Sequence, residues 1–169
     1  LLLWHQLPEQ IPVHFNSEGV ADSYQSKLWG VTFIYLVIFA CHWFAAIITS
    51  VDPRRRNISS KIYRLVLWIC PVISVFVGVM IYGTALNWPW VNINFMANLL
   101  LGVIFIVIGN YLPKCRQNYT IGIKLPWTLS DEENWDKTHR FAGKIWMLCG
   151  VLEIIVGFLP IAQFEIVMI

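Results

Sequence analysis

The stretch LWGVTFIYLVIFACHWFAAIITSV, from Leu28 to Val51, decides the fold because it contains no Asp, Glu, Lys or Arg. A helix needs about 20 mainly apolar residues to cross the hydrocarbon core of a bilayer. In lipid, the backbone polar groups of a single segment are satisfied only in a helix. Three further apolar runs are long enough, namely Leu65–Trp90 with a kink expected at Pro71, Val91–Leu112 and Phe141–Pro160. The sequence therefore predicts an all-α polytopic helical bundle with four complete spans.

The composition of the whole chain agrees with a membrane protein. It is 57% hydrophobic and 13% charged, with a mean hydropathy of +0.62, whereas soluble domains are roughly 45 to 50% apolar and 25% charged. The chain begins with LLLWHQ and stops inside the apolar run Ile161–Ile169, which we interpret as the end of an earlier span and the start of a later one. We therefore expect six spans in the intact protein. We divide the chain into 1–51 (partial span, exterior cap and next span) and 52–169.

The positions of Lys and Arg predict the orientation. Eleven of the twelve basic residues lie in the connection 52–64 or in the region 113–144, and the twelfth is Lys27. Cytoplasmic loops carry an excess of Lys and Arg, so both regions should be cytoplasmic. The segment His5–Lys27 and the turn Asn87–Asn92 should face outward. Because the basic residues divide by membrane side rather than forming one patch, direct binding of nucleic acid is not expected.

The cytoplasmic segment Gly109–Arg140, GNYLPKCRQNYTIGIKLPWTLSDEENWDKTHR, is longer than most connections and rich in aromatic residues. Long loops are usually functional or disordered, and the aromatic side chains predict that this loop is ordered. Trp127 and Trp135 are candidates either for interfacial anchors or for contacts with a partner. The acidic run after Ser130 predicts a capped helix start. We expect His139 to anchor that helix rather than to bind a metal.

The exterior segment Leu7–Gly30 should form a compact irregular cap. Pro8 and Pro12 keep the chain extended and prevent a helix, and its Asn, Gly and Asp residues favour turns. Its apolar residues alternate between Leu7 and Phe15, so a short strand on the membrane surface is also compatible with the pattern.

Polar residues inside the spans are candidates for function. At about 1.5 Å per residue, Asn98 and Glu153 both lie roughly 10 Å below the outer surface, and His42 lies about 12 Å from Glu153 along the membrane normal. His42 and Glu153 should therefore not pair. Glu153 is either a functional group or a protonated or Asn98-bonded glutamate in the bundle interior. No spacing typical of a catalytic, cofactor or metal site occurs, and the four cysteines predict neither a disulfide nor a zinc site.

The residue pattern resembles a known family. Its amino-terminal part resembles the small membrane domain of unknown function that precedes SdpI-type immunity proteins, through Leu7-Pro8, Ile11-Pro12, His14-Phe15-Asn16, Gly19, Asp22 and Ser26-Lys27. Asp52-Pro53-Arg54 resembles their first cytoplasmic turn. Their signature region is matched by Gly109-Asn110, Pro113-Lys114, Asn118, Gly122-Ile123-Lys124, Pro126-Trp127-Thr128-Leu129, Trp135 and Thr138-His139-Arg140. Two departures are Lys124, where Arg is expected, and Glu153.

The resemblance implies a multi-pass membrane protein of a Gram-positive bacterium that protects the cell from a secreted toxic peptide. It also implies that a cytoplasmic transcriptional repressor is held at the membrane when toxin is present. The expected partners are thus the peptide, membrane lipid and the repressor, with no cofactor and no enzymatic activity. The toxin-recognition candidates are His14, Phe15, Asn16, Asp22 and Lys27. The candidates of the cytoplasmic signature loop are Asn110, Lys114, Asn118, Gly122, Lys124, Pro126, Trp127, Thr128, Trp135, Thr138 and His139.

Two other functional classes remain open from the residues alone. A small transporter would need polar residues along a route through the bundle. A membrane enzyme acting on lipid or cell-wall precursors would need paired acid and base groups on one side of the membrane.

Overall fold

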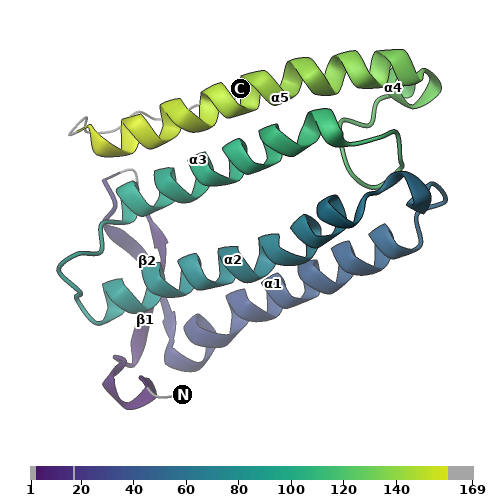
Figure 1. The fold of residues 1–169 in the computed structure, drawn as a ribbon. Coiled ribbons are helices and arrows are strands. Elements are labelled where there is room, and N and C mark those ends of the chain that lie inside the picture. Colours follow the sequence, from purple (N-terminus) through teal and green to yellow (C-terminus); the bar gives the residue numbers. More distant parts are fainter. Residues whose placement is uncertain (1–2, 17, 160–169) are drawn as a thin grey trace.

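The computed structural model describes residues 3–16 and 18–159, and four long helices dominate it (Figure 1). These are α1 (Lys27–Ser50), α2 (Ser60–Ala85), α3 (Ile93–Tyr111) and α5 (Glu132–Phe158), each long and apolar enough to cross a membrane. The smaller elements are β1 (Gln10–Phe15), β2 (Ala21–Ser26), α4 (Pro126–Ser130) and the 3-10 turns η1 (Trp4–Gln6), η2 (Arg55–Asn57) and η3 (Leu112–Lys114). The predicted all-α polytopic membrane protein with four spans is confirmed.

Two helix boundaries differ from the prediction because capping residues override the apolar pattern. Helix α2 starts at Ser60 rather than Leu65, since the Ser59 side chain accepts a hydrogen bond from the Ile62 N–H at 3.3 Å. It stops before Asn87, whose φ of 53° interrupts the helix. Pro71 lies inside it.

Helix α5 starts at Glu132 rather than Phe141, because Asp131 caps it by accepting from the Glu133 N–H at 2.8 Å. The predicted capped start after Ser130 is confirmed. The connection 109–140 is consequently shorter than expected, since both its ends and α4 are helical. The later partial span predicted at 161–169 falls outside the described residues. Of the earlier one, Trp4–Gln6 form η1, and residues 1 and 2 are likewise outside.

The helices form two antiparallel pairs, α1 with α2 and α3 with α5 (Figure 1). Glycines bring α3 and α5 into backbone contact. A Cβ added at Gly102 would lie 2.7 Å from the Gly150 carbonyl oxygen, and one added at Gly109 would lie 2.8 Å from that of Gly143. Small residues at matching levels are the usual means of close helix packing in membranes. The seven-residue spacing of these glycines therefore fixes how α3 and α5 pack.

The two ends of the bundle carry different structures. The β1–β2 hairpin and the α2–α3 turn lie at one end, and the α1–α2 connection and residues 112–131 lie at the other (Figure 1). The amino-terminal cap is thus an ordered antiparallel hairpin, so the expectation of an irregular cap is wrong and that of a short strand is confirmed. The basic connections gather at the end opposite the hairpin, as their cytoplasmic assignment requires.

The glycine contact gives a first prediction. Gly150→Val should lower protein abundance and melting temperature in detergent, because its branched side chain would overlap the Gly102 carbonyl and Ile106 at a cost of about 1 to 3 kcal/mol. The control is Cys149→Val, since Cys149 is the exposed neighbour on the same helix. Equal melting temperatures for the two variants would contradict close α3–α5 packing.

The second prediction concerns orientation. In intact cells, a membrane-impermeant thiol reagent should label a cysteine placed at exposed Ser23 in the hairpin and should not label one placed at exposed Ser130 beside α4. The parent protein provides the background for its four native cysteines. The reverse labelling pattern would overturn the assignment of the hairpin to the outside.

Candidate functional site

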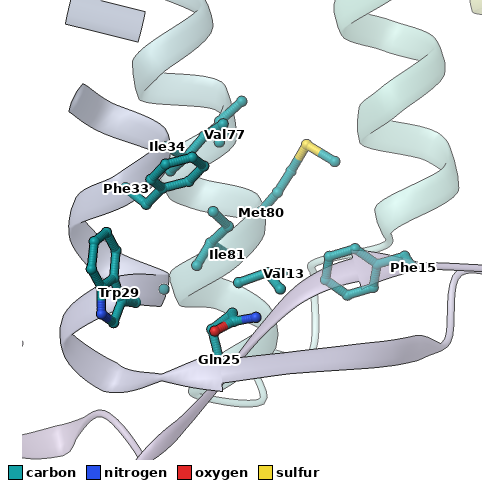
Figure 2. A pocket seen from close by; sticks show the side chains of 10 residues that line it. Val13, Phe15, Gln25, Trp29, Phe33, Ile34, Val77, Met80 and Ile81 are labelled. Atoms are coloured by element: carbon teal, nitrogen blue, oxygen red, sulfur yellow. The ribbon is translucent and has the colours of Figure 1, made fainter. Parts of the chain in front are cut away.

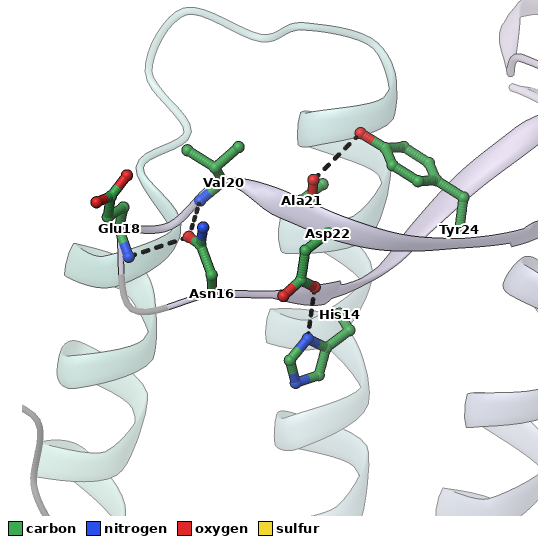
Figure 3. Close-up of polar contacts among 7 residues, drawn as sticks. All are labelled: His14, Asn16, Glu18, Val20, Ala21, Asp22 and Tyr24. Atoms are coloured by element: carbon green, nitrogen blue, oxygen red, sulfur yellow. Dashed lines mark hydrogen bonds and ion pairs between the residues drawn. The ribbon is translucent and has the colours of Figure 1, made fainter.

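A polar turn shapes the hairpin at the end of the bundle that is predicted to face outward. β1 and β2 pair from Gln10 opposite Ser26 to Phe15 opposite Ala21, with irregular register around His14. The Asn16 side-chain oxygen accepts hydrogen bonds from the backbone N–H groups of Glu18 at 3.0 Å and Val20 at 2.9 Å (Figure 3). Asn16 therefore stabilises the turn, which is a common use of asparagine.

The hairpin is held on the helices by apolar contact and one cation. Ile11 is completely buried and clusters with Leu7 and with Ile81 of α2. Gly30 of α1 makes room for it, because a Cβ there would lie 2.6 Å from the Ile11 Cβ. The Lys27 ammonium donates to the Leu7 carbonyl at 2.8 Å, and its side chain is only 11% exposed. Lys27, a predicted toxin contact, thus fastens the chain preceding the hairpin to α1.

An apolar groove of about 690 Å³ lies where the hairpin meets α1 and α2. Phe15, Val13 and Gln25 of the hairpin border it, facing residues of both helices (Figure 2). The helix side consists of Trp29, Gly30, Phe33, Ile34, Val77, Met80 and Ile81. Trp29 and Phe33 are each 57% exposed. The groove is half-open and mostly aromatic or aliphatic, a lining typical of sites for apolar ligands.

His14 and Asp22 form a polar pair on the hairpin, with the His14 Nδ1 2.6 Å from the Asp22 Oδ1 (Figure 3). The two side chains are 68% and 44% exposed. An exposed pair of this kind contributes little to stability. Of the five toxin-recognition candidates, Phe15 lies in the groove, His14 and Asp22 are accessible on the hairpin, and Asn16 and Lys27 have structural contacts.

The end opposite the hairpin, which is predicted to be cytoplasmic, contains a second ordered site centred on the Asp52 carboxylate, here named the cytoplasmic cluster. Asp52 is 5% exposed and accepts hydrogen bonds from the Arg54 N–H at 2.7 Å, the Tyr119 N–H at 3.0 Å and the Thr120 hydroxyl. The Arg54 guanidinium in turn donates to the Gln117 side-chain oxygen. These bonds join the segment between α1 and α2 to residues 117–120, although the two segments are far apart in the sequence.

Asn118 and Gln117 fold the chain that follows η3. The buried Asn118 side chain accepts from the N–H groups of Thr120 and Ile121, and donates to the Ile121 carbonyl at 3.0 Å. Gln117 donates to the Thr128 carbonyl at 2.7 Å. Burial raises the pKa of the Cys115 thiol, although a hydrogen bond from Asn118 lowers it in part. Cys115 is therefore a packing residue rather than a reactive thiol.

Trp135 and His139 of α5 form the floor of this cytoplasmic cluster. They are 0% and 1% exposed and stack with ring centroids 4.0 Å apart. His139 Nε2 accepts from the Ile123 N–H at 2.9 Å, so the ring is neutral and its Nδ1–H donates to the Trp135 carbonyl at 2.7 Å. Gly122 has a φ of +118°, and a Cβ there would lie 2.4 Å from His139 Nε2. Only glycine fits this position.

The other predicted signature residues make mainly local contacts. Asn110 accepts from the Lys114 ammonium at 2.9 Å, and Lys124 donates to the Thr120 carbonyl at 2.9 Å. Thr128 is fully buried, and its hydroxyl accepts a hydrogen bond from the Leu125 N–H at 2.9 Å and donates one to the Ile123 carbonyl at 2.8 Å. Pro126 is the first residue of α4, and Thr138 donates to Asn134. Trp127 is 56% exposed, whereas Trp135, paired with it in the sequence analysis, reaches no surface.

The polar groups within the spans do not form one site. Asn98 packs against Gly157, one helical turn from Glu153, in agreement with their predicted shared depth. Among the described residues, the buried His42 Nδ1 has no hydrogen-bond partner, and its ring meets Trp43 edge-on. No group of three His, Cys, Asp or Glu residues in the described ranges is arranged to hold a metal ion.

Sequence reasoning missed Gln117 and the central position of Asp52. Asp52 was visible only as part of an Asp-Pro-Arg turn, and nothing in the spacing of residues 52 and 119 shows that they meet. The only indication in the sequence was the adjacent pair Gln117 and Asn118, whose amide side chains both donate and accept hydrogen bonds.

The chain is similar to known proteins along most of its length. Residues 1–39 match the Domain of unknown function (DUF1648), and residues 114–169 match the SdpI/YfhL protein family. The chain is 26% identical over 163 residues to the Immunity protein SdpI of Bacillus subtilis (strain 168), covering 94% of this chain and 74% of that protein. No solved structure matches significantly. The two matches lie in chain order and the relative aligns over 94% of this chain, so this chain is similar to the SdpI/YfhL protein family.

Proposed function

We propose that this membrane protein confers immunity to a secreted toxic peptide, which it binds at the outer end of the bundle. The relative named an immunity protein supports the class of function. The proposed location of the peptide-binding site rests on the half-open apolar groove between the hairpin and helices α1 and α2. It lies at the end opposite the basic connections, where a secreted peptide arrives first.

The lining of the groove suits a membrane-damaging peptide, which must present apolar side chains to enter lipid. Burying such side chains against Trp29, Phe33 and Met80 removes apolar surface from water, which favours the complex. Laying an apolar face into a hydrophobic groove is a common mode of peptide recognition. A peptide held there has less apolar surface available for the bilayer, which accounts for protection without chemistry.

The hairpin supplies polar groups that can select among peptides. His14 and Asp22 stand exposed on it, and Gln25 borders the groove. In a site with an apolar lining, a few well-placed polar groups fix the orientation of the bound ligand and select among ligands.

The cytoplasmic cluster suits a second role, the capture of a transcriptional repressor. Trp127 is 56% and Tyr119 46% exposed, and both belong to segments fixed by the buried bonds of Asn118, Thr128 and Trp135. Exposed aromatic side chains on a rigid base are typical of protein-binding surfaces.

The transporter and enzyme alternatives have less support. The three polar groups within the spans lie on α1, α3 and α5, and the contacts of His42 do not include Asn98 or Glu153. The His14 and Asp22 side chains are 68% and 44% exposed, so the pair is open to water, whereas catalysis is favoured by a site that excludes it.

The groove gives a third prediction. In a peptide-sensitive host exposed to a panel of secreted peptides, the parent protein should raise survival against at least one. Trp29→Ala should reduce that protection at unchanged membrane abundance, because losing an aromatic contact costs about 2 kcal/mol, or roughly 30-fold in affinity.

The matched control is Trp43→Ala, which removes a comparably exposed tryptophan from the same helix outside the groove. Equal loss of protection in both variants would indicate a general effect of tryptophan on helix depth. Full protection by Trp29→Ala would exclude the groove as the peptide site.

The fourth prediction separates the cytoplasmic surface from the outer one. Trp127→Ala should abolish recruitment of a repressor to the membrane while leaving abundance and peptide resistance unchanged, since the bilayer separates the two surfaces. Trp135→Ala, by contrast, should lower abundance, because a buried tryptophan truncated to alanine typically costs about 3 to 5 kcal/mol. Normal recruitment by Trp127→Ala at normal abundance would rule out its docking role.

A further inference from the structure

One face of α2 stays uncovered from its first turn to the middle of the helix. Its exposed residues follow one another at intervals of three or four, and they are Lys61, Arg64, Trp68, Val72 and Val75. Residues with this spacing share one side of a helix. Trp68 is 65% and Val75 67% exposed, so no described element packs over them. We name these five residues the α2 stripe.

The two cations at the start of the α2 stripe have no anionic partner. Neither Lys61 nor Arg64 forms a hydrogen bond or an ion pair with a described residue, and α2 contains no Asp or Glu. On α5, by contrast, Lys137 and Arg140 each face a carboxylate four residues earlier on the same helix. Like charges one turn apart on a helix repel each other. An anion between Lys61 and Arg64 would offset this repulsion.

The order of residues along the α2 stripe matches the order of groups in a phospholipid. Arg64 is the last charged residue of α2, so it lies at the depth of the headgroups. Trp68 follows, and tryptophan is enriched at membrane interfaces. Its indole N–H makes no hydrogen bond to a described residue. From Arg64 to Val75 the helix rises about 17 Å, which is close to half of the ~30 Å hydrocarbon core. The stripe therefore extends along one leaflet.

We propose that the α2 stripe binds an anionic phospholipid from the leaflet next to the basic connections. The phosphate lies between the Lys61 ammonium and the Arg64 guanidinium. The Trp68 indole donates to an ester carbonyl, and one acyl chain follows Val72 and Val75. Clustered basic residues beside a span attract anionic lipids, whereas a zwitterionic headgroup would bring its own cation to two uncompensated charges.

A soluble acidic protein would fit this surface less well than a lipid does. It would reach only the two cations at the start of the helix, whereas the α2 stripe continues into the span. The lipid site lies apart from the peptide groove and does not depend on it.

The test compares two lipid probes in phosphatidylcholine vesicles that contain the full chain. A small fraction of the lipid is either phosphatidylglycerol or phosphatidylcholine with the same photoreactive diazirine on one acyl chain. After illumination, digestion and mass spectrometry, the phosphatidylglycerol probe should label Val72 and Val75 roughly 25-fold more, about fivefold for each cation. Leu36 and Phe39, exposed on α1, provide the reference that both probes should label equally, since the only cation of α1 is Lys27 at its opposite end.

Neutral substitutions test the two cations. Lys61→Gln and Arg64→Gln should each lower labelling by the phosphatidylglycerol probe roughly fivefold, and the double variant should label like the phosphatidylcholine probe. The matched control is Lys144→Gln, which removes an exposed cation of α5 and should leave the labelling of α2 unchanged. Melting temperatures in detergent verify that each variant is folded.

Three results would overturn the proposal. Equal labelling of Val72 and Val75 by both probes would show that the surface does not select anionic lipid. Labelling by neither probe would show that another chain or segment covers the stripe. An equal loss in Lys144→Gln would indicate a general effect of surface charge. If Arg64→Gln fails to fold, the comparison of the two probes on the parent protein still decides.

Discussion

The buried carboxylate of Asp52 is the interaction on which the arrangement of the two helix pairs depends. It accepts hydrogen bonds from its own turn and from Tyr119 and Thr120, so it joins the α1–α2 pair to the chain that leaves α3. A buried carboxylate without donors would cost several kcal/mol, so the donors must be in place whenever the bundle is folded. The segment 115–125 is therefore constrained to lie across the ends of α1 and α2.

Helix α2 contacts both functional ends. Near its start, Ile62 packs with Trp135, Ile58 and Cys115 in the cytoplasmic cluster. Near its end, Ile81 packs with Ile11 and Leu7 under the hairpin. Val77 and Met80 of this helix also line the groove in which we propose that the peptide binds.

Much of the fold could be predicted from local sequence rules. The spans follow from apolar length, and the start of α5 follows from Asp131 with its acidic first turn, although the apolar pattern alone placed that helix nine residues too late. Residues Leu7 to Phe15 alternate as a strand does, yet Pro8, Pro12 and Asn16 suggested irregular structure. Pro12 is tolerated because a two-stranded sheet has only edge strands, and Asn16 forms the turn between them.

The sequence by itself determined the membrane class, the number of complete spans and the gathering of nearly all Lys and Arg residues at one end, because hydropathy and charge act residue by residue against the bilayer. The contacts of residues distant in the chain were decided only by tertiary structure. Asp52 meets Tyr119, Gly122 meets His139, and Ile11 meets Gly30. Each of these contacts depends on the packing of whole helices, and no local pattern records it. For the same reason, the groove beneath the hairpin emerges only when α1 and α2 are placed side by side.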